Sequence, residues 1–396
     1  MSTSIIIAGG GIVGRTLAVA LKTQSHLDVT LLSGPPRPAD ERASTIAAAA
    51  RKLYVRVGVW PHLAEAAQPV ETMTITDSAP DDTIRPEILT FEGEAGANAF
   101  AHVVANAALD AALKARCEAL GIRDITERVT LFTEDRDSVT ATLSDGSTAQ
   151  GAILVAADGR SSRLREIAGI ATVSHSHHQY GIVGTLTHAR PHYGRATQHF
   201  LPNGPLALLP LPGEASSMVW TERPSFAQSL VAMDPAMASL EIERVFGLSL
   251  GRLCVEPPLQ AHPLTTMLAR QMASGRLALV GDAAHVIHPL AGQGLNLGLR
   301  DVAALAQVLI DAHRNGEDVS LALPRYSKWR RADVTQMALV TDSLNAIFSR
   351  RSDLLRAVRS IGLSFVERRD DLKTLFIGEA AGQTGEVPRL MRGEAI

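Results

Sequence analysis

Three glycines near the start of the chain have the spacing of a phosphate-binding turn. Gly9, Gly11 and Gly14 form the pattern GxGxxG after the β-branched run Ser4–Ala8 and before a stretch with helical spacing of apolar residues. The first glycine permits a tight turn, the second lets the backbone approach a pyrophosphate, and the third lets helix and strand pack closely. The helix start then offers its N–H groups to the phosphates. The pattern predicts a dinucleotide site; the alternative is a bare packing turn.

The position where such a site usually carries an acid holds a serine. The second strand is expected at Asp28–Leu32, and an acid directly after it would bind the ribose hydroxyls. Ser33 stands there. Because a hydroxyl is a weaker acceptor than a charged carboxylate, Ser33 predicts weaker ribose binding or a contact supplied from elsewhere.

A second glycine-rich turn with a carboxylate lies later in the chain. A buried strand, LALV, leads into Gly281 and Asp282, and a helix is expected from about Gly294. A carboxylate at the end of a strand can accept hydrogen bonds from sugar or ribityl hydroxyls, and N–H groups at Gly292–Leu295 would face an electron-rich ring edge. A capped helix explains one glycine and one aspartate. It does not explain the sequence HPLAGQGLN at residues 288–296.

The elements around these turns predict an α/β fold with a Rossmann-like parallel sheet, into which a mostly antiparallel sheet is inserted. Ser4–Leu32 has the pattern of one strand–helix–strand unit, whereas Tyr180–Glu222 contains strands separated by Pro and Gly clusters. Helices are expected at Ala43–Trp60, Asn106–Leu120, Leu295–Ile310, Pro324–Asn345 and Ser349–Val366.

The composition is that of an ordinary globular protein, with 46% apolar and 20% charged residues in a chain of 396. The formal charge of −3 leaves no cationic excess for a phosphate backbone, so nucleic acid is not an expected partner. Cys117 and Cys254 lie far apart, which argues against a disulfide framework and favours a reducing cytoplasm. No apolar run has the length of a membrane span, and the start lacks a signal-peptide pattern, so an unprocessed soluble protein is expected.

Three motifs, in order, carry a resemblance to a known family. They are GxGxxG at Gly9–Gly14, the pair Asp158-Gly159 in LVAADGRSSRLRE, and Gly281-Asp282 followed by HPLAGQGLN and Asp301. On these motifs the chain resembles the class A flavoprotein aromatic hydroxylases, and within them the ubiquinone-biosynthesis hydroxylases. The stretches RPHYGRATQHFLPNGPLALLPLPG, MVWTERP and GEVPRLMRG are also similar to that subgroup, so the likeness covers nearly the whole chain.

The resemblance implies FAD as the bound cofactor and NADPH or NADH as a transient reductant, since a second GxGxxG is missing. It implies a discontinuous FAD-binding domain of residues 1–75, 101–172 and 266–345. The substrate-binding domain would comprise residues 76–100 and 173–265, and residues 346–396 would form a C-terminal helical segment. The implied reaction is hydroxylation of a small hydrophobic phenol with O2.

The resemblance also assigns site residues. The catalytic set would line the flavin face where oxygen reacts and would help to exclude water; it consists of His288, Pro289, Gly292 and Gln293. The cofactor-binding set consists of Gly9, Gly11, Gly14, Ser33, Arg42, Asp158, Gly159, Gly281, Asp282, Gly294, Leu295 and Asn296. Two departures from the family pattern concern the cofactor: Ser33 replaces an acid, and Ala107 stands where an arginine is usual. Both predict weaker FAD binding, by a few kcal/mol if neither contact is replaced.

Five histidines have alternative interpretations. His285 and His288 are three residues apart, and an imidazole could accept a phenolic proton, or both could brace the loop. His175, His177 and His178 suggest a metal, but no carboxylate or thiolate completes a recognisable set, so a solvated strand or loop is expected there. No metal site is predicted.

The sequence leaves several kinds of macromolecular partner open. The basic run Lys328–Arg331 and the pair Arg350-Arg351 are interpreted as a solvated helix face, with contact to anionic lipid as the alternative. A peripheral membrane contact, a biosynthetic complex and a homo-oligomer all stay open. The expected location is the cytoplasm, with the inner face of the membrane as the alternative.

The inserted sheet predicts the kind of substrate. Gly181–Arg223 is apolar, and its cations Arg190, Arg195 and Arg223 lie in turns, so a hydrophobic phenol is expected rather than a charged hydroxybenzoate. Three alternatives remain: a hydroxylase of another aromatic compound, a non-hydroxylating flavoprotein, and an assembly partner that binds little or no flavin. The WxWxIP signature of flavin halogenases is absent.

Overall fold

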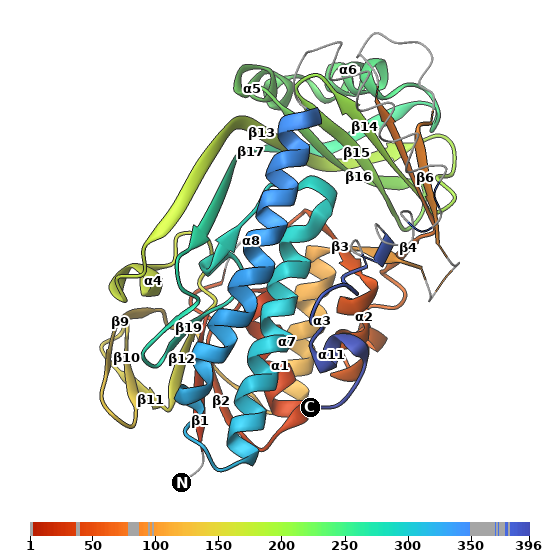
Figure 1. Cartoon of the computed structure of the whole chain (residues 1–396). Coiled ribbons are helices and arrows are strands. Elements are labelled where there is room, and N and C mark those ends of the chain that lie inside the picture. The colour runs from red at the N-terminus through yellow and green to blue at the C-terminus, as the bar shows by residue number, and fades with distance from the viewer. Residues whose placement is uncertain are drawn as a thin grey trace.

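The computed structural model describes residues 3–36, 40–77, 87–93, 96, 99–348, 369, 371, 377–378 and 381–396. The predicted α/β architecture is confirmed. Figure 1 shows a parallel sheet with its helices in one half of the molecule and a large antiparallel sheet in the other. Within the described residues, no helix combines the length and the apolar character that crossing a membrane requires.

The first sheet has six strands in the order β18-β19-β12-β1-β2-β8. All neighbouring pairs are parallel except β18 with β19. Ile5, Ile6 and Ile7 of β1 are fully buried, as expected for a parallel sheet covered on both faces. The strands are β1 (Ser4–Ala8), β2 (Asp28–Leu32), β8 (Arg123–Ile125), β12 (Ile153–Ala156), β18 (Ala273–Ser274) and β19 (Leu277–Leu279).

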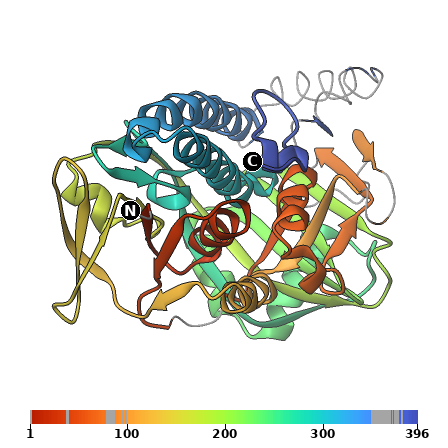
Figure 2. The same cartoon turned by 90° about the horizontal axis from the view of Figure 1, so that it is seen from below.

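Long helices pack beside this sheet. Helix α1 lies between α3 and α7, and α8 runs along α7 on the outside (Figure 2). The helices of this half are α1 (Ile12–Gln24), α2 (Ala48–Arg56), α3 (Asn106–Ala119), α4 (Arg163–Ile167), α7 (Gln293–Arg314), α8 (Leu323–Phe348) and α11 (Arg389–Arg392).

The second large sheet has eight strands in the order β20-β17-β13-β16-β15-β14-β5-β6. It is antiparallel except where β14 pairs with β5. Helices α5 (Pro224–Ala232) and α6 (Pro235–Phe246) pack on it around Trp220 and Ile182. The strands are β5 (Thr72–Asp77), β6 (Leu89–Glu92), β13 (Thr172–His188), β14 (Arg195–Leu201), β15 (Gly204–Leu211), β16 (Ala215–Glu222), β17 (Leu253–Ala269) and β20 (His285–Val286).

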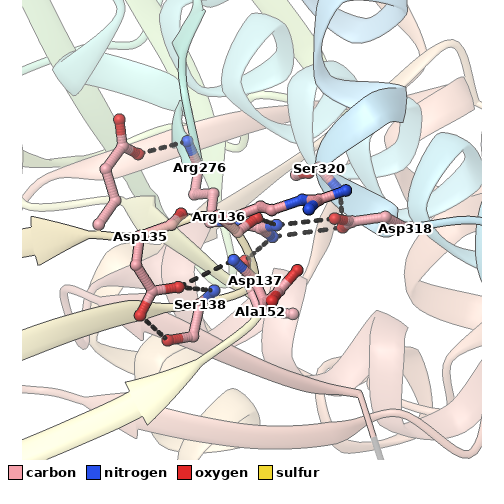
Figure 3. Close-up of polar contacts among 9 residues, drawn as sticks. Asp135, Arg136, Asp137, Ser138, Ala152, Arg276, Asp318 and Ser320 are labelled. Atoms are coloured by element: carbon pink, nitrogen blue, oxygen red, sulfur yellow. Dashed lines mark hydrogen bonds and ion pairs between the residues drawn. The ribbon is translucent and has the colours of Figure 1, made fainter.

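Two three-stranded sheets complete the fold: β9 (Val129–Glu134), β10 (Val139–Leu143) and β11 (Thr148–Gly151), and β3 (Ala43–Ala47), β7 (Ala101–Ala105) and β4 (Gln68–Val70). Arg276, just before β19, ties the first of them to the core (Figure 3). Its buried guanidinium donates to the carbonyls of Asp135 (3.3 Å) and Ala152 (2.8 Å) and pairs with Asp318 at 2.7 Å. The strand that leads to Gly281 is thereby fixed at its start.

The prediction of a single helix over Ala43–Trp60 is wrong at its beginning. Ala43–Ala47 forms β3, paired antiparallel with β7, and the helix covers only Ala48–Arg56. Pairing with a distant strand here overrides the helical preference of alanine. The helix predicted at Ser349–Val366 lies outside the described residues.

Candidate functional site

The GxGxxG turn connects β1 to α1 with little room to spare. A Cβ on Gly9, whose φ is +127°, would lie 2.1 Å from the carbonyl oxygen of Ala157. A Cβ on Gly14 would lie 1.9 Å from the carbonyl oxygen of Gly9. At Gly11, in contrast, no atom lies within 4 Å, and this residue starts α1 without a side-chain cap. The turn thus combines tight packing on one side with open backbone N–H groups on the other, as phosphate binding requires.

Ser33 follows β2 at the same end of the sheet. Its backbone N–H donates to the carbonyl of Ile125 at 2.9 Å, whereas its hydroxyl has only long contacts of 3.5 Å. A Cβ on Gly10 would lie 2.3 Å from the Cβ of Ser33. Gly10 is therefore a tightly constrained residue that sequence reasoning missed, because the GxGxxG pattern leaves that position free.

Arg42 is held in place by an acid that sequence reasoning also missed. Its guanidinium donates twice to Asp40, at 2.8 and 2.7 Å, and Asn106 donates to the same carboxylate at 2.8 Å. Although partial burial alone would raise it, Arg42 and Asn106 hold the pKa of Asp40 below its ordinary value. Asn106 directly precedes Ala107, so a polar group does hold this region together in the absence of the family arginine.

Asp158 and Gly159 lie between β12 and α4. The Oδ1 atom of Asp158 is buried and has no hydrogen-bond partner among the described residues, while Oδ2 accepts from Leu164 N at 3.4 Å. A buried acceptor without a partner is costly, so this atom marks a place where a donor from a bound molecule fits. Gly159, with φ of +88°, has open space at its Cβ position.

Asp282 lies where several predicted site residues converge. Its side chain is exposed, but the protein atoms around it raise the pKa of its carboxyl group. The charges of His285, Arg42 and Arg160 oppose this and favour the ionised form. The structure therefore brings Arg42 and Arg160, which directly follows Asp158-Gly159, within electrostatic reach of Asp282.

Helix α7, like α1, is preceded by a glycine. Gly292, with φ of +65°, precedes the helix without a side-chain cap, and nothing lies within 4 Å of the Cβ position of Gly294. The amide of Asn296 donates to the carbonyl of Thr45 (2.8 Å) and accepts from Ala47 N (2.9 Å). Asn296 thus binds the protein backbone and fastens the helix start to β3, while Leu295 packs partly buried against the core.

A buried ionic network holds the Gly281 turn. Asp301 on α7 accepts hydrogen bonds from Gly281 N (2.9 Å), His285 Nε2 (2.6 Å) and Arg330 Nε (2.7 Å). Asp301 and Arg330 are both fully buried. Burial alone would raise the pKa of Asp301, but His285 and Arg330 lower it, so the carboxylate stays charged. Of the two interpretations of His285, bracing of the loop is the one this contact supports.

His288 sits in a different environment. Its ring is buried, neither ring nitrogen has a hydrogen-bond partner among the described residues, and burial lowers its pKa to about 3. It contacts His177 edge-on at 4.9 Å between ring centroids. The expectation of a solvated strand is therefore wrong for His177, whose side chain is 4% exposed, although His175 and His178 are exposed. An irregularity in β13, with φ of +54° at His178, accompanies the inward position of His177.

An apolar cluster adjoins the loop that contains Pro289. Leu290 packs with Phe200 of β14, Ile75 of β5, Leu89 of β6 and Phe348 of α8. The ring of Phe348 stacks on Phe200 with 3.8 Å between centroids. The three arginines of the inserted sheet do not belong to this cluster: Arg190, Arg195 and Arg223 are exposed, and Arg195 pairs with Glu87 at 3.2 Å.

Comparisons with known proteins bear on this arrangement. The family model described as FAD binding domain matches residues 2–341. The ubiquinone hydroxylase UbiL of Rhodospirillum rubrum is 39% identical over 98% of this chain and 92% of its own length. The 3-demethoxyubiquinol 3-hydroxylase of Escherichia coli is 33% identical over 96% of this chain and 98% of its own length.

Two solved structures share the fold. The p-nitrophenol 4-monooxygenase PnpA of Pseudomonas putida gives a TM-score of 0.80 at 17% identity, over 98% of this chain and 99% of that chain. HpxO of Klebsiella pneumoniae, complexed with FAD and uric acid, gives a TM-score of 0.76 at 20% identity, over 96% of both chains.

Proposed function

Since the chain belongs to the FAD binding domain family, and within it to the aromatic monooxygenases, we propose that it hydroxylates a hydrophobic phenol of ubiquinone biosynthesis. O2 supplies the oxygen atom, and NADPH or NADH is the transient reductant. FAD, when bound, supplies the activation of O2.

The residues described above suit FAD. The helix starts at Gly11 and at Gly292–Gly294 would face the pyrophosphate and the pyrimidine end of the ring, since neither helix has a side-chain cap. Asp282 would accept hydrogen bonds from ribityl hydroxyls, and the unpartnered Oδ1 of Asp158 would accept from a bound donor. Arg42, held by Asp40, would lie beside the cofactor.

The residues proposed as the catalytic set flank Leu290, which belongs to the apolar cluster. Pro289, Gly292 and Gln293 would line the cofactor on the side of Leu290, and the cluster around Phe200 would keep water out. His288 is neutral at neutral pH because burial lowers its pKa to about 3, so a ring nitrogen would accept a hydrogen bond from the phenol hydroxyl without taking its proton.

The observation that carries the substrate class is the apolar cluster of Phe200, Phe348 and Leu290 beside this loop, with the sheet arginines outside it. A buried carboxylate would need a cationic partner, and Arg190, Arg195 and Arg223 of the described sheet are all exposed. We therefore expect a prenylated methoxyphenol to stimulate NAD(P)H oxidation at least tenfold more than 4-hydroxybenzoate does, an estimate based on roughly 1.4 kcal/mol per factor of ten.

The test measures NAD(P)H oxidation, O2 consumption and hydroxylated product by mass spectrometry for both substrates. Coupled product from the benzoate at an equal rate would refute the ubiquinone-pathway proposal. NAD(P)H oxidation that yields only hydrogen peroxide would favour a non-hydroxylating flavoprotein, and a protein without flavin or activity would favour an assembly partner.

Ser33→Glu is expected to tighten FAD binding. The hydroxyl of Ser33 makes only long contacts, and a carboxylate there could accept charge-assisted hydrogen bonds from the ribose, each of which contributes about 1.5–3 kcal/mol. Calorimetric titration of the apoprotein with FAD should show a Kd at least about tenfold lower. Ser33→Gln, of equal size but neutral, is the control, and equal affinities of both variants and the parent would place the ribose elsewhere.

A further inference from the structure

One face of α8 is uncovered along the outside of the molecule. Figure 1 shows α8 running from the end of the parallel sheet to the antiparallel sheet, and Figure 2 shows it at the edge of the molecule. The exposed side chains of α8 recur every three or four residues, so they form one stripe. Leu321, which is 73% exposed, extends the stripe by one turn before the helix.

The cations of this stripe lie in the first half of α8, and exposed apolar side chains follow them toward its end. Its charged residues are Arg325, Lys328 and Arg331, and its apolar end carries Leu339 and Val340, which are 64% and 44% exposed. The two acids of α8, which is described along its whole length, are only partly exposed: 22% of the Asp333 side chain and 32% of the Asp342 side chain. The stripe therefore presents unbalanced positive charge next to apolar side chains.

Both acids of α8 are bound on its inner side. Asp333 pairs with Arg300 at 2.9 Å and also with Arg330. Asp342 accepts a hydrogen bond from Thr266 at 2.8 Å. Arg325, Lys328 and Arg331 form no ion pair with any described residue, so their charges are available to an anionic partner.

A groove accompanies the stripe. It has a volume of about 1060 Å³ and lies between α8 and the segment Gln271–Gly275. Leu323, Leu339 and Val340 contribute apolar walls, while Lys328 and Arg331 line it with cations. Apolar walls beside cations match a phospholipid, whose phosphate and acyl chain are adjacent.

We propose that this face of α8 docks onto an anionic lipid bilayer. The cations would contact lipid phosphates, and Leu339 and Val340 would enter the boundary between headgroups and acyl chains. The purpose of docking rests on the proposed function. Helix α8 ends at Phe348, which stacks on Phe200 in the apolar cluster. A phenol dissolved in the lipid would therefore be delivered beside the loop that contains Pro289. The binding itself does not depend on that function.

Vesicle flotation of the full chain tests the proposal. The protein should bind vesicles of equimolar phosphatidylcholine and phosphatidylglycerol, bind phosphatidylcholine alone much less, and dissociate as salt is raised. The double variant Lys328→Glu with Arg331→Glu should bind at least about tenfold more weakly. Leu339→Ser with Val340→Ser should also weaken binding while leaving the salt dependence unchanged.

A matched control reverses two exposed cations elsewhere. Lys114 of α3 and Arg123 of β8 are exposed, and α3 is separated from α8 by α1 and α7 (Figure 2). Lys114→Glu with Arg123→Glu should leave binding unchanged. The proposal would be overturned if the parent protein did not bind vesicles. It would also be overturned if the control variant lost as much vesicle binding as the Lys328→Glu, Arg331→Glu variant. Light scattering gives a further outcome against the proposal: the parent is an oligomer that does not bind vesicles, and Leu339→Ser with Val340→Ser converts it to monomers.

A separate measurement distinguishes this proposal from the proposed function. NAD(P)H oxidation with a water-soluble phenol should be unchanged in the Lys328→Glu, Arg331→Glu variant, since neither residue belongs to the catalytic set. If the parent protein binds vesicles but does not hydroxylate any phenol, the proposed function is wrong and the docking proposal stands. If it hydroxylates the phenol but does not bind vesicles, the proposed function stands and the docking proposal is wrong.

Discussion

Gly14→Ala is expected to abolish FAD binding and to destabilise the fold, whereas Gly11→Ala should lose FAD affinity alone. A Cβ at Gly14 would lie 1.9 Å from the carbonyl oxygen of Gly9 and 3.3 Å from the Cβ of Ala157. Gly9 has little room to move away, because the carbonyl oxygen of Ala157 packs against it, 2.1 Å from where a Cβ of Gly9 would lie. Helix α1 would have to move away from β1, and overpacking of this kind costs about 1–3 kcal/mol or more.

Gly11 is the matched control because it lies in the same turn without the crowding. Its φ of −80° is accessible to alanine, and nothing lies within 4 Å of its Cβ position. An added methyl group there is harmless to the protein but would occupy the space that a pyrophosphate has to enter. Urea unfolding and the visible flavin spectrum of both variants measure the two effects. Full FAD affinity in Gly11→Ala would show that the pyrophosphate does not pass this residue.

Local patterns were enough to predict this turn. The strand Ser4–Ala8, the glycine spacing and the following strand Asp28–Leu32 all lie within one short segment, so their geometry follows from nearby residues. The start of α7 was predicted for the same reason. The Gly-Asp motif, the left-handed Gly292 and the helix follow one another directly.

Features that depend on distant partners could not be predicted. Ala43–Ala47 became a strand because β7 and the amide of Asn296 supply its hydrogen bonds, and neither is near it in sequence. The burial of His177 depends on contact with His288, more than a hundred residues later. In the same way, Asp40 belongs to no motif, and only its contacts with Arg42 and Asn106 show its role.

The second large loss of stability is expected on mutation of Asp301, whose partners Gly281, His285 and Arg330 are also distant in sequence. Asp301→Asn would remove the buried carboxylate that pairs with the fully buried Arg330 and leave it only the partly exposed Asp333. Breaking a buried ion pair from one side costs about 3–5 kcal/mol. An amide also cannot accept from Gly281, His285 and Arg330 together as a carboxylate does, because its NH2 group would face donors. Urea unfolding should therefore show a large loss of stability, and the loosened Gly281 turn should weaken FAD binding.

Asp333→Asn is the matched control, since Asp333 also contacts Arg330 but its side chain is 22% exposed. Its removal should cost roughly 1 kcal/mol, near the usual value for partly solvated pairs.

The pH dependence identifies the charge of Asp301 as the cause. The folded-state pKa of Asp301 is held below the ordinary value of 3.8, with His285 and Arg330 outweighing burial, so its contribution is complete above that value and is lost as the pH falls through the folded-state pKa. The stability difference between the parent and Asp301→Asn should accordingly be constant near neutral pH and shrink on acidification below 3.8. A difference that does not change with pH would mean that the shape of the side chain, and not its charge, holds the Gly281 turn.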